Sequence, residues 1–108
     1  GGLDIRPFPD NWEMKKALGE KADNPKRWDD YAAINQIDSI ANDDLALIID
    51  CGYGDFFAEV NRNFHDKLME RGIDHDYIVR PGVHDGLYWN NSIDYQWLFF
   101  KKFFDRGR

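Results

Sequence analysis

The second half of the chain alternates between short apolar runs and longer amphipathic stretches. This pattern predicts a strand at residues 45–50, a helix at 55–71, a second strand at 74–80 and a last helix at 89–105. The first run (LALIID) is continuously apolar, which is typical of a strand covered on both faces. The helix between the two strands ends before Gly72. Its apolar stripe consists of Phe56, Val60, Phe64 and Leu68.

Strands that alternate with helices form parallel sheets with right-handed crossovers, so the expected fold class is α/β. Two strands alone leave a sheet edge uncovered, and the sequence therefore looks like part of a larger α/β domain. The last helix is strongly aromatic, and we expect its rings to form core against the sheet. These rings are Trp89, Tyr95, Trp97, Phe99, Phe100, Phe103 and Phe104.

The first part of the chain has a different character. Its opening ten residues contain two glycines and two prolines and predict a loop. A short helix is expected at residues 12–18, and a longer one begins at residue 24 and runs to 37 or 40. We therefore divide the chain into a helical segment, 1–44, and a strand-helix-strand-helix segment, 45–108.

Composition narrows the classes of function. The net charge of −6, with basic residues scattered along the chain, argues against nucleic acids and anionic membrane surfaces as partners. No apolar run reaches the roughly 18 residues of a membrane-spanning helix. Cys51 is the only cysteine, so no internal disulfide can form. One cysteine beside scattered histidines lacks the spacing of a metal site, and we expect neither a metal nor a cofactor.

Two glycine-rich loops, CGYGDFF and PGVHDGLYW, follow the two predicted strands. Each loop places one titratable side chain, Asp55 or His84, beyond the carboxyl end of a strand, where open parallel sheets bind ligands. A carboxylate beside an imidazole serves nucleophilic acyl transfer, because it fixes the tautomer whose free nitrogen accepts the nucleophile's proton. The order of Asp before His is that of the α/β-hydrolases.

The residues of these two loops and their flanking helices also carry a specific family resemblance. The loops DCGYGDFF and PGVHDGLYW, the intervening helix with Asn61 and Asn63, and the aromatic last helix resemble an esterase family of the α/β-hydrolase superfamily. That family includes esterase D, S-formylglutathione hydrolase, tributyrin esterases and feruloyl esterases. The opening GGLDIRPFPDNW resembles the family's segment after the nucleophile elbow. The resemblance covers essentially the whole chain and is strongest over residues 45–104.

The resemblance implies the C-terminal portion of an α/β-hydrolase fold, with residues 1–44 as post-nucleophile loop and lid-like segment. Asp55 matches the triad acid and His84 the triad base of a serine carboxylesterase. Acetyl or sugar-linked esters are the substrates we expect from the family, without a cofactor. The partners we expect are this small-molecule ester, and either the missing N-terminal part of the same protein or a second copy of the chain.

The family's nucleophile lies in a G-x-S-x-G turn, which this sequence lacks. Ser39 (IDSIA) and Ser92 (NNSID) do not lie in a strand-to-helix elbow. The oxyanion hole also belongs to the family's N-terminal part. We therefore expect this chain alone to be catalytically incomplete. The absent serine also favours the alternative function, a non-catalytic hydrolase-like binding or structural module, and an upstream G-x-S-x-G segment would decide against it.

Plainer roles compete for the same residues. Asp55 suits a helix N-cap, and both of its roles can hold because only one needs the second carboxylate oxygen. We expect His65 and His75 to be solvated or structural, and Cys51 to be a buried core thiol rather than a nucleophile.

Substrate contacts are harder to place than the acid and the base. Trp12 and Trp28, together with Phe8, belong to the lid-like segment and are candidates for lining an acyl pocket.

Overall fold

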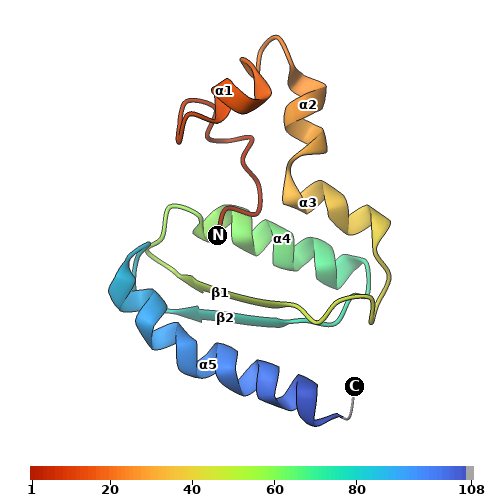
Figure 1. Cartoon of the computed structure of the whole chain (residues 1–108), viewed down its shortest axis with the longest axis vertical. Coiled ribbons are helices and arrows are strands. Elements are labelled where there is room, and N and C mark those ends of the chain that lie inside the picture. The colour runs from red at the N-terminus through yellow and green to blue at the C-terminus, as the bar shows by residue number, and fades with distance from the viewer. Residues whose placement is uncertain (107–108) are drawn as a thin grey trace.

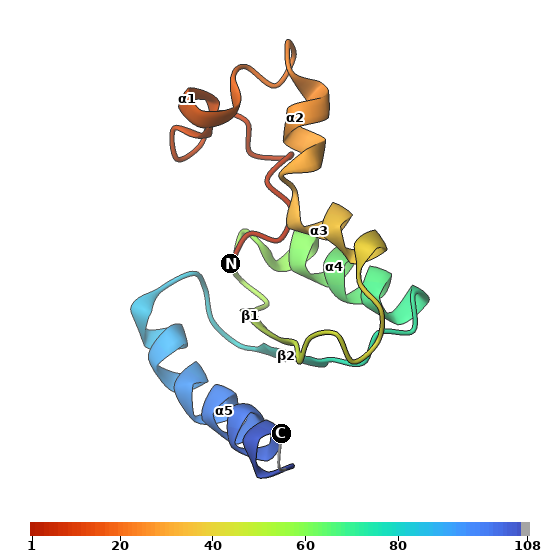
Figure 2. The ribbon, with the colours of Figure 1, turned by 45° about the vertical axis from the view of Figure 1, so that its right-hand side comes forward.

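The computed structural model describes residues 1–106 and contains a two-stranded parallel sheet with one helix on each face (Figure 1). β1 (Ile48–Gly52) and β2 (Asp76–Arg80) pair in parallel, with Ile48 opposite Asp76 and Gly52 opposite Arg80. α4 (Ala58–Glu70) connects the strands, and α5 (Gly86–Asp105) follows β2. Figure 2 shows the two helices on opposite sides of the strands. The expected strand-helix-strand-helix order and the parallel sheet are confirmed.

The observed elements begin at different residues from those expected, and local hydrogen bonds explain why. α5 begins at Gly86 because the Asp85 side chain caps it by accepting the Tyr88 N–H at 2.9 Å. α4 begins at Ala58 because the preceding residues form a turn closed on the Asp55 carboxylate. Leu45 was expected in β1 but is 54% exposed and lies in a turn before it.

The helical segment consists of α1 (Met14–Leu18), α2 (Pro25–Asp30), α3 (Ala33–Gln36) and the 3₁₀ helix η1 (Ile37–Ser39). The prediction of a single long helix from residue 24 is therefore wrong, because the helix is interrupted between α2 and α3. Ala32 has an extended backbone, and the Ile34 N–H donates to the Leu3 carbonyl at 2.9 Å. The side-chain amides of Asn35 and Gln36 donate to the Asp29 and Asp30 carbonyls. These bonds replace the helical ladder that continuity would require.

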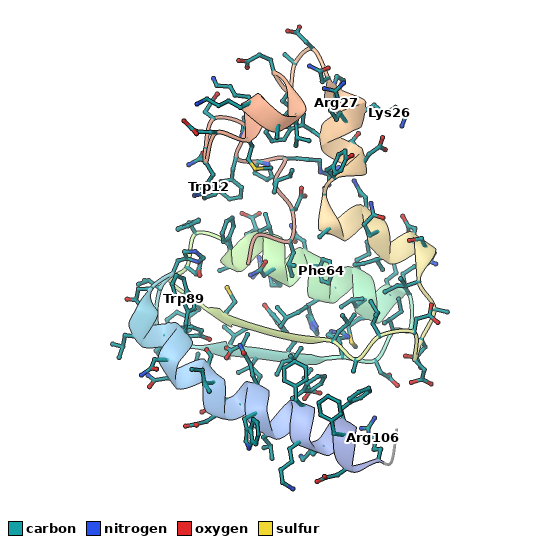
Figure 3. All side chains as sticks on the ribbon, viewed as in Figure 1. Trp12, Lys26, Arg27, Phe64, Trp89 and Arg106 are labelled. Carbon is teal, nitrogen blue, oxygen red and sulfur yellow. The ribbon has the colours of Figure 1, made fainter. Side chains whose placement is uncertain are left out.

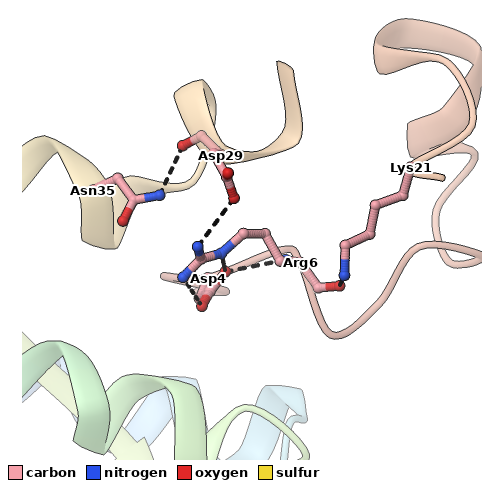
Figure 4. A network of polar contacts seen from close by, with 5 residues as sticks. All are labelled: Asp4, Arg6, Lys21, Asp29 and Asn35. Carbon is pink, nitrogen blue, oxygen red and sulfur yellow. Dashed lines mark hydrogen bonds and ion pairs between the residues drawn. The ribbon is translucent and has the colours of Figure 1, made fainter. Parts of the chain in front are cut away.

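A polar network holds the opening loop against α2 (Figure 4). The Arg6 guanidinium donates to Asp4 at 2.9 Å and to Asp29 at 3.1 Å, and the Lys21 ammonium donates to the Arg6 carbonyl. Because Asp4 is mostly buried, its carboxylate depends on the Arg6 contacts for its hydrogen bonds. The network fixes the start of the chain to the helical segment.

The apolar core lies between α4, the helical segment and one face of the sheet. Its buried members are Ala32, Ile34, Ile37, Ile49, Leu68 and Ile73. Leu68 is fully buried, and burial of such a side chain contributes about 1.5–3 kcal/mol. α4 therefore joins the helical segment to the sheet.

The opposite face of the sheet is held to α5 by a buried polar cluster. The Asp50 carboxylate is 1% exposed, forms an ion pair with Arg80 at 2.7 Å and accepts a hydrogen bond from the Tyr88 hydroxyl. Arg80 also donates to the Ser92 hydroxyl at 2.6 Å and lies over the rings of Tyr88 and Tyr95. One guanidinium thus connects β1, β2 and α5.

The aromatic residues of α5 are mostly on the surface, contrary to the expectation that they form core against the sheet. Among them, only Tyr88 is buried within residues 86–106, and Trp97 and Phe104 are 71% and 65% exposed. The reason is geometric. The aromatic residues of α5 occupy more than one face of the helix, and a sheet of two strands covers only one of those faces. A second stripe faces outward and consists of Trp89, Ile93, Trp97, Phe100 and Phe104, which we call the outer stripe.

No helix within residues 1–106 has both the length and the apolar character needed to cross a membrane.

Removing the Asp50 carboxylate should destabilise the fold strongly. Asp50→Ala leaves the Arg80 guanidinium without its buried counter-charge, which costs about 3–5 kcal/mol when one partner of a buried pair is removed. Urea unfolding followed by circular dichroism measures this change. Asp76→Ala, at an exposed aspartate of the neighbouring strand, is the control and should change stability by about 0.5 kcal/mol or less. Equal losses in the two variants would contradict the role given to Asp50.

The outer stripe should make the 108-residue chain associate with itself. An exposed apolar surface of this kind gains free energy when a second surface covers it. We expect sedimentation velocity to show a concentration-dependent average mass, which the double substitution Trp97→Gln and Phe104→Gln reduces. Tyr31→Gln, at a residue of the helical segment that is 70% exposed, should leave association unchanged. A chain that stays monomeric at every concentration would contradict this expectation.

Candidate active site

Asp55 lies in the turn after β1 and uses its two carboxylate oxygens for different purposes. Oδ1 accepts the backbone N–H of Phe57 at 2.8 Å, and Oδ2 lies 3.0 Å from Nδ1 of His84. The side chain is 6% exposed, so these contacts replace most of its hydration. The helix N-cap suggested for Asp55 is wrong, because Phe57 occupies the N-cap position of α4 and Asp55 lies in the turn before it. One carboxylate oxygen closes that turn and the other contacts the imidazole.

His84 lies in the loop between β2 and α5. The next residue, Asp85, donates its N–H to the Val83 carbonyl at 2.9 Å and caps α5 with its side chain. The imidazole is 28% exposed. Among the described residues, Asp55 is its one hydrogen-bond partner, at Nδ1, and Nε2 has none. This arrangement leaves one ring nitrogen for an incoming group.

The two loops are joined directly by backbone contacts just beyond the sheet. The Gly54 N–H donates to the Gly82 carbonyl at 2.9 Å, and the Tyr53 N–H donates to the Arg80 carbonyl at 3.0 Å. A Cβ at Gly52 would lie 2.4 Å from the Gly82 carbonyl oxygen, a separation that real structures do not tolerate. The close approach requires glycine, and it sets the spacing between Asp55 and His84.

Aromatic rings surround the imidazole. The ring centroids of Phe56, Phe57 and Trp89 lie 4.8, 5.3 and 4.8 Å from that of His84. Phe57 is 7% exposed and supports the site from within, whereas Phe56 and Trp89 are about half exposed, at 54% and 50%. The His84 imidazole therefore lies in an apolar setting with accessible aromatic rings beside it.

The two tryptophans expected to line an acyl pocket lie in different environments. Trp12 is half exposed, and its ring is stacked with Phe56 at 6.0 Å and lies 5.3 Å from Phe57, so it borders the site (Figure 3). Trp28 is completely buried in the helical segment, and its indole N–H donates to the Gly19 carbonyl at 2.9 Å. The structure thus gives Trp28 a buried packing position, whereas Trp12 is at the surface.

Phe56 and Trp89 were not predicted as site residues. The signal was present, because both rings are close in the sequence to Asp55 or His84: Phe56 follows Asp55 directly, and Trp89 lies five residues after His84. Aromatic residues next to loops are common, however, and only the folded geometry separates these two from the rest of the aromatic last helix.

The two serines are engaged elsewhere. The Ser39 hydroxyl is on η1 and donates to the Gln36 carbonyl at 2.8 Å. Ser92 is a buried residue of α5, and its hydroxyl donates to the Tyr88 carbonyl at 3.0 Å and accepts from Arg80. Neither hydroxyl is hydrogen-bonded to His84, so within the described residues Asp55 and His84 have no serine partner.

The remaining reactive side chains have structural surroundings. His65 Nδ1 lies 2.7 Å from His75 Nε2, and the His65 ring stacks on Tyr77. His75 precedes β2, so this pair lies at the opposite end of the strand from His84. Burial raises the pKa of the Cys51 thiol, which disfavours the thiolate that a nucleophile needs. Across residues 1–106 no group of three His, Cys, Asp or Glu side chains could hold a metal ion.

Gly52→Ala should separate the two loops. The added methyl group clashes with the Gly82 carbonyl, which is backbone and cannot rotate away. We expect a loss of stability of about 1–3 kcal/mol and weakening of the His84–Asp55 contact, visible as a change in the imidazole resonances by NMR. Gly86→Ala is the matched control, because a Cβ there meets no atom within 4 Å. Unchanged His84 resonances in Gly52→Ala would contradict the proposed spacing role.

The arrangement of the elements has a counterpart of known structure. This chain matches the structure of a ferulic acid esterase with a TM-score of 0.61 and 24% sequence identity, over 91% of this chain and 38% of the esterase. No protein-family model and no curated protein matches the sequence. The chain therefore spans well under half the length of the esterase that it matches, and at this identity the likeness shows that it shares the fold of that part of an esterase.

Proposed function

We propose that this chain supplies the acid and the base of a serine carboxylesterase with an α/β-hydrolase fold. The observation that carries the proposal is the contact of 3.0 Å between Asp55 Oδ2 and His84 Nδ1, made by loops that follow two adjacent parallel strands. Catalytic acids and bases of open parallel sheets lie at this edge. The serine and the oxyanion hole come from polypeptide outside residues 1–108.

In this mechanism His84 works through Nε2. As the serine hydroxyl attacks the ester carbonyl, Nε2 accepts its proton, and the imidazolium then delivers that proton to the departing alcohol. Water repeats the sequence on the acyl-enzyme: Nε2 accepts a proton from water, and the serine oxygen leaves with the proton that His84 returns. The reaction needs no redox partner.

Asp55 holds the imidazole in the reactive tautomer. Its Oδ2 accepts the Nδ1 proton, which leaves the Nε2 lone pair for the serine. Because Oδ1 is bound to the Phe57 N–H, the carboxylate is oriented before substrate arrives and reorganises little as charge develops on His84. The aromatic surroundings lower the local dielectric and strengthen this ion pair in the transition state.

The surfaces beside His84 favour an ester that carries a planar aromatic group. The half-exposed Phe56 ring lies 4.8 Å from His84, and the half-exposed Trp12 ring stacks on Phe56. A planar aromatic group gains contact over its whole face on such a surface, whereas an acetyl group covers little of it. We therefore place aromatic esters, including sugar-linked ones, ahead of the simple acetyl esters expected from the sequence. The name of the matched ferulic acid esterase agrees with this preference.

The proposal predicts the effect of removing the base and the acid in the complete polypeptide that contains this chain and a G-x-S-x-G segment. His84→Ala should lower kcat for methyl ferulate and 4-nitrophenyl acetate by about 10⁶-fold, and Asp55→Asn by about 10⁴-fold through the wrong tautomer. His65→Ala, the same residue type at the other end of the sheet, should retain activity. Hydrolysis that survives His84→Ala would reject the assignment.

The alternative, a non-catalytic module, gives a different result. A complete polypeptide without a G-x-S-x-G serine that binds methyl ferulate, measured by calorimetry, without hydrolysing it would favour the module. Trp12→Ala and Phe56→Ala should then weaken binding, whereas in the esterase they should raise KM for methyl ferulate more than for ethyl acetate, an ester without an aromatic ring.

A further inference from the structure

The hydrogen bond to Asp55 does not by itself fix the His84 ring. A single contact at Nδ1 lets the imidazole swing about the Nδ1–Oδ2 line, and rotation about the terminal side-chain torsion of histidine is broad and close to two-fold. The ring is also 28% exposed, so solvent is available to hydrogen-bond it in other orientations. A second constraint must hold Nε2 toward the position of the nucleophile.

Two rings stand perpendicular to the imidazole. Trp89 makes an interplanar angle of 85° at a centroid distance of 4.8 Å, and Phe57 makes an angle of 81° at 5.3 Å. Edge-to-face pairs of this kind are directional, because the positive edge of one ring meets the negative face of the other. We propose that Trp89 is a positioning residue, which holds the His84 imidazole in the orientation that keeps Nδ1 on Asp55 and Nε2 open.

The start of α5 explains how Trp89 reaches the imidazole. The Asp85 cap fixes the first turn, and the Trp89 N–H donates to the Asp85 carbonyl at 3.1 Å. The preceding residue, Tyr88, is anchored to the sheet by the Asp50 carboxylate and lies against Gly82. With Tyr88 turned to the sheet, the next side chain lies about 100° further round the helix, beside the His84 loop. Figure 3 shows Trp89 at this end of α5.

The exposure of Trp89 distinguishes it from a residue that only packs in the core. Its ring is 50% exposed, so it contributes less to the core than a buried tryptophan such as Trp28. Trp97 belongs to the same outer stripe two turns later and is 71% exposed, but it lies away from the imidazole. The two tryptophans therefore share a helix and a surface, and only one of them contacts the candidate base.

This inference rests on the proposed role of His84, and its test does not use ester hydrolysis. The imidazole of the 108-residue chain is observed by NMR with ¹⁵N-labelled histidine, at a pH where the ring is neutral, and the ratio of the Nδ1–H to the Nε2–H tautomer is measured. We expect the Nδ1–H form to dominate for His84. Trp89→Leu should lower this ratio by about 2- to 10-fold, the range that corresponds to one edge-to-face pair.

Matched variants separate positioning from helix stability. Trp89→Phe keeps an aromatic edge and should restore most of the wild-type ratio, and Trp97→Leu removes a tryptophan from the same stripe and should leave the ratio unchanged. An unchanged ratio in Trp89→Leu, or an equal fall in Trp97→Leu, would overturn the proposal.

A direct measurement in the wild-type chain covers the case in which Trp89→Leu does not fold. The Trp89 ring current should shift the His84 ring protons, and nuclear Overhauser effects should connect the two rings. Absence of both would also overturn the proposal. If these signals are present but the complete polypeptide does not hydrolyse esters, the esterase function fails and the positioning contact stands.

Discussion

The backbone contact between Gly54 and Gly82 is the constraint on which the site depends. The parallel ladder of β1 and β2 ends at Gly52 and Arg80, and the bond from the Gly54 N–H to the Gly82 carbonyl keeps the chains together beyond that end. With no Cβ at Gly52, the two loops approach at backbone distance. Asp55 and His84 then need only short side chains to meet, and little side-chain entropy is lost in bringing them together.

The two faces of the sheet are stabilised by different physics. On the α4 face, aliphatic residues such as Ile49 and Leu68 pack without polar partners. On the α5 face, the Asp50–Arg80 pair and the Tyr88 hydroxyl form the junction. Burial of the Tyr88 hydroxyl is the largest cause of its raised pKa, and its hydrogen bond to Asp50 is the next. The hydroxyl therefore stays protonated and remains a donor. A buried ion pair of this kind adds little to the stability of the fold relative to apolar packing, but it is satisfied by few arrangements of the helix on the sheet. The orientation of α5, and with it the positions of His84 and Trp89, follows from that selectivity.

The parallel strands were predictable from the sequence, because LALIID and DHDYIVR flank an amphipathic stretch of helical length. The proximity of Asp55 to His84 was also predictable, because each follows a strand in a glycine-rich loop. The break between α2 and α3 was out of reach, since it depends on the Leu3 carbonyl, more than twenty residues earlier in the chain. The exposure of α5 and the burial of Trp28 were missed for a related reason. A hydrophobic pattern shows that a surface is apolar and does not show what covers it.

The outer stripe of α5 also bears on how a cell would handle this chain. Chaperones and proteases distinguish damaged from native proteins largely by exposed apolar surface, and the stripe offers five such side chains on one ordered helix. A correctly folded polypeptide would thus expose the same kind of apolar surface as a misfolded one wherever nothing covers that helix. Its abundance would be governed by the supply of whatever buries the stripe, and less by the stability of its own core.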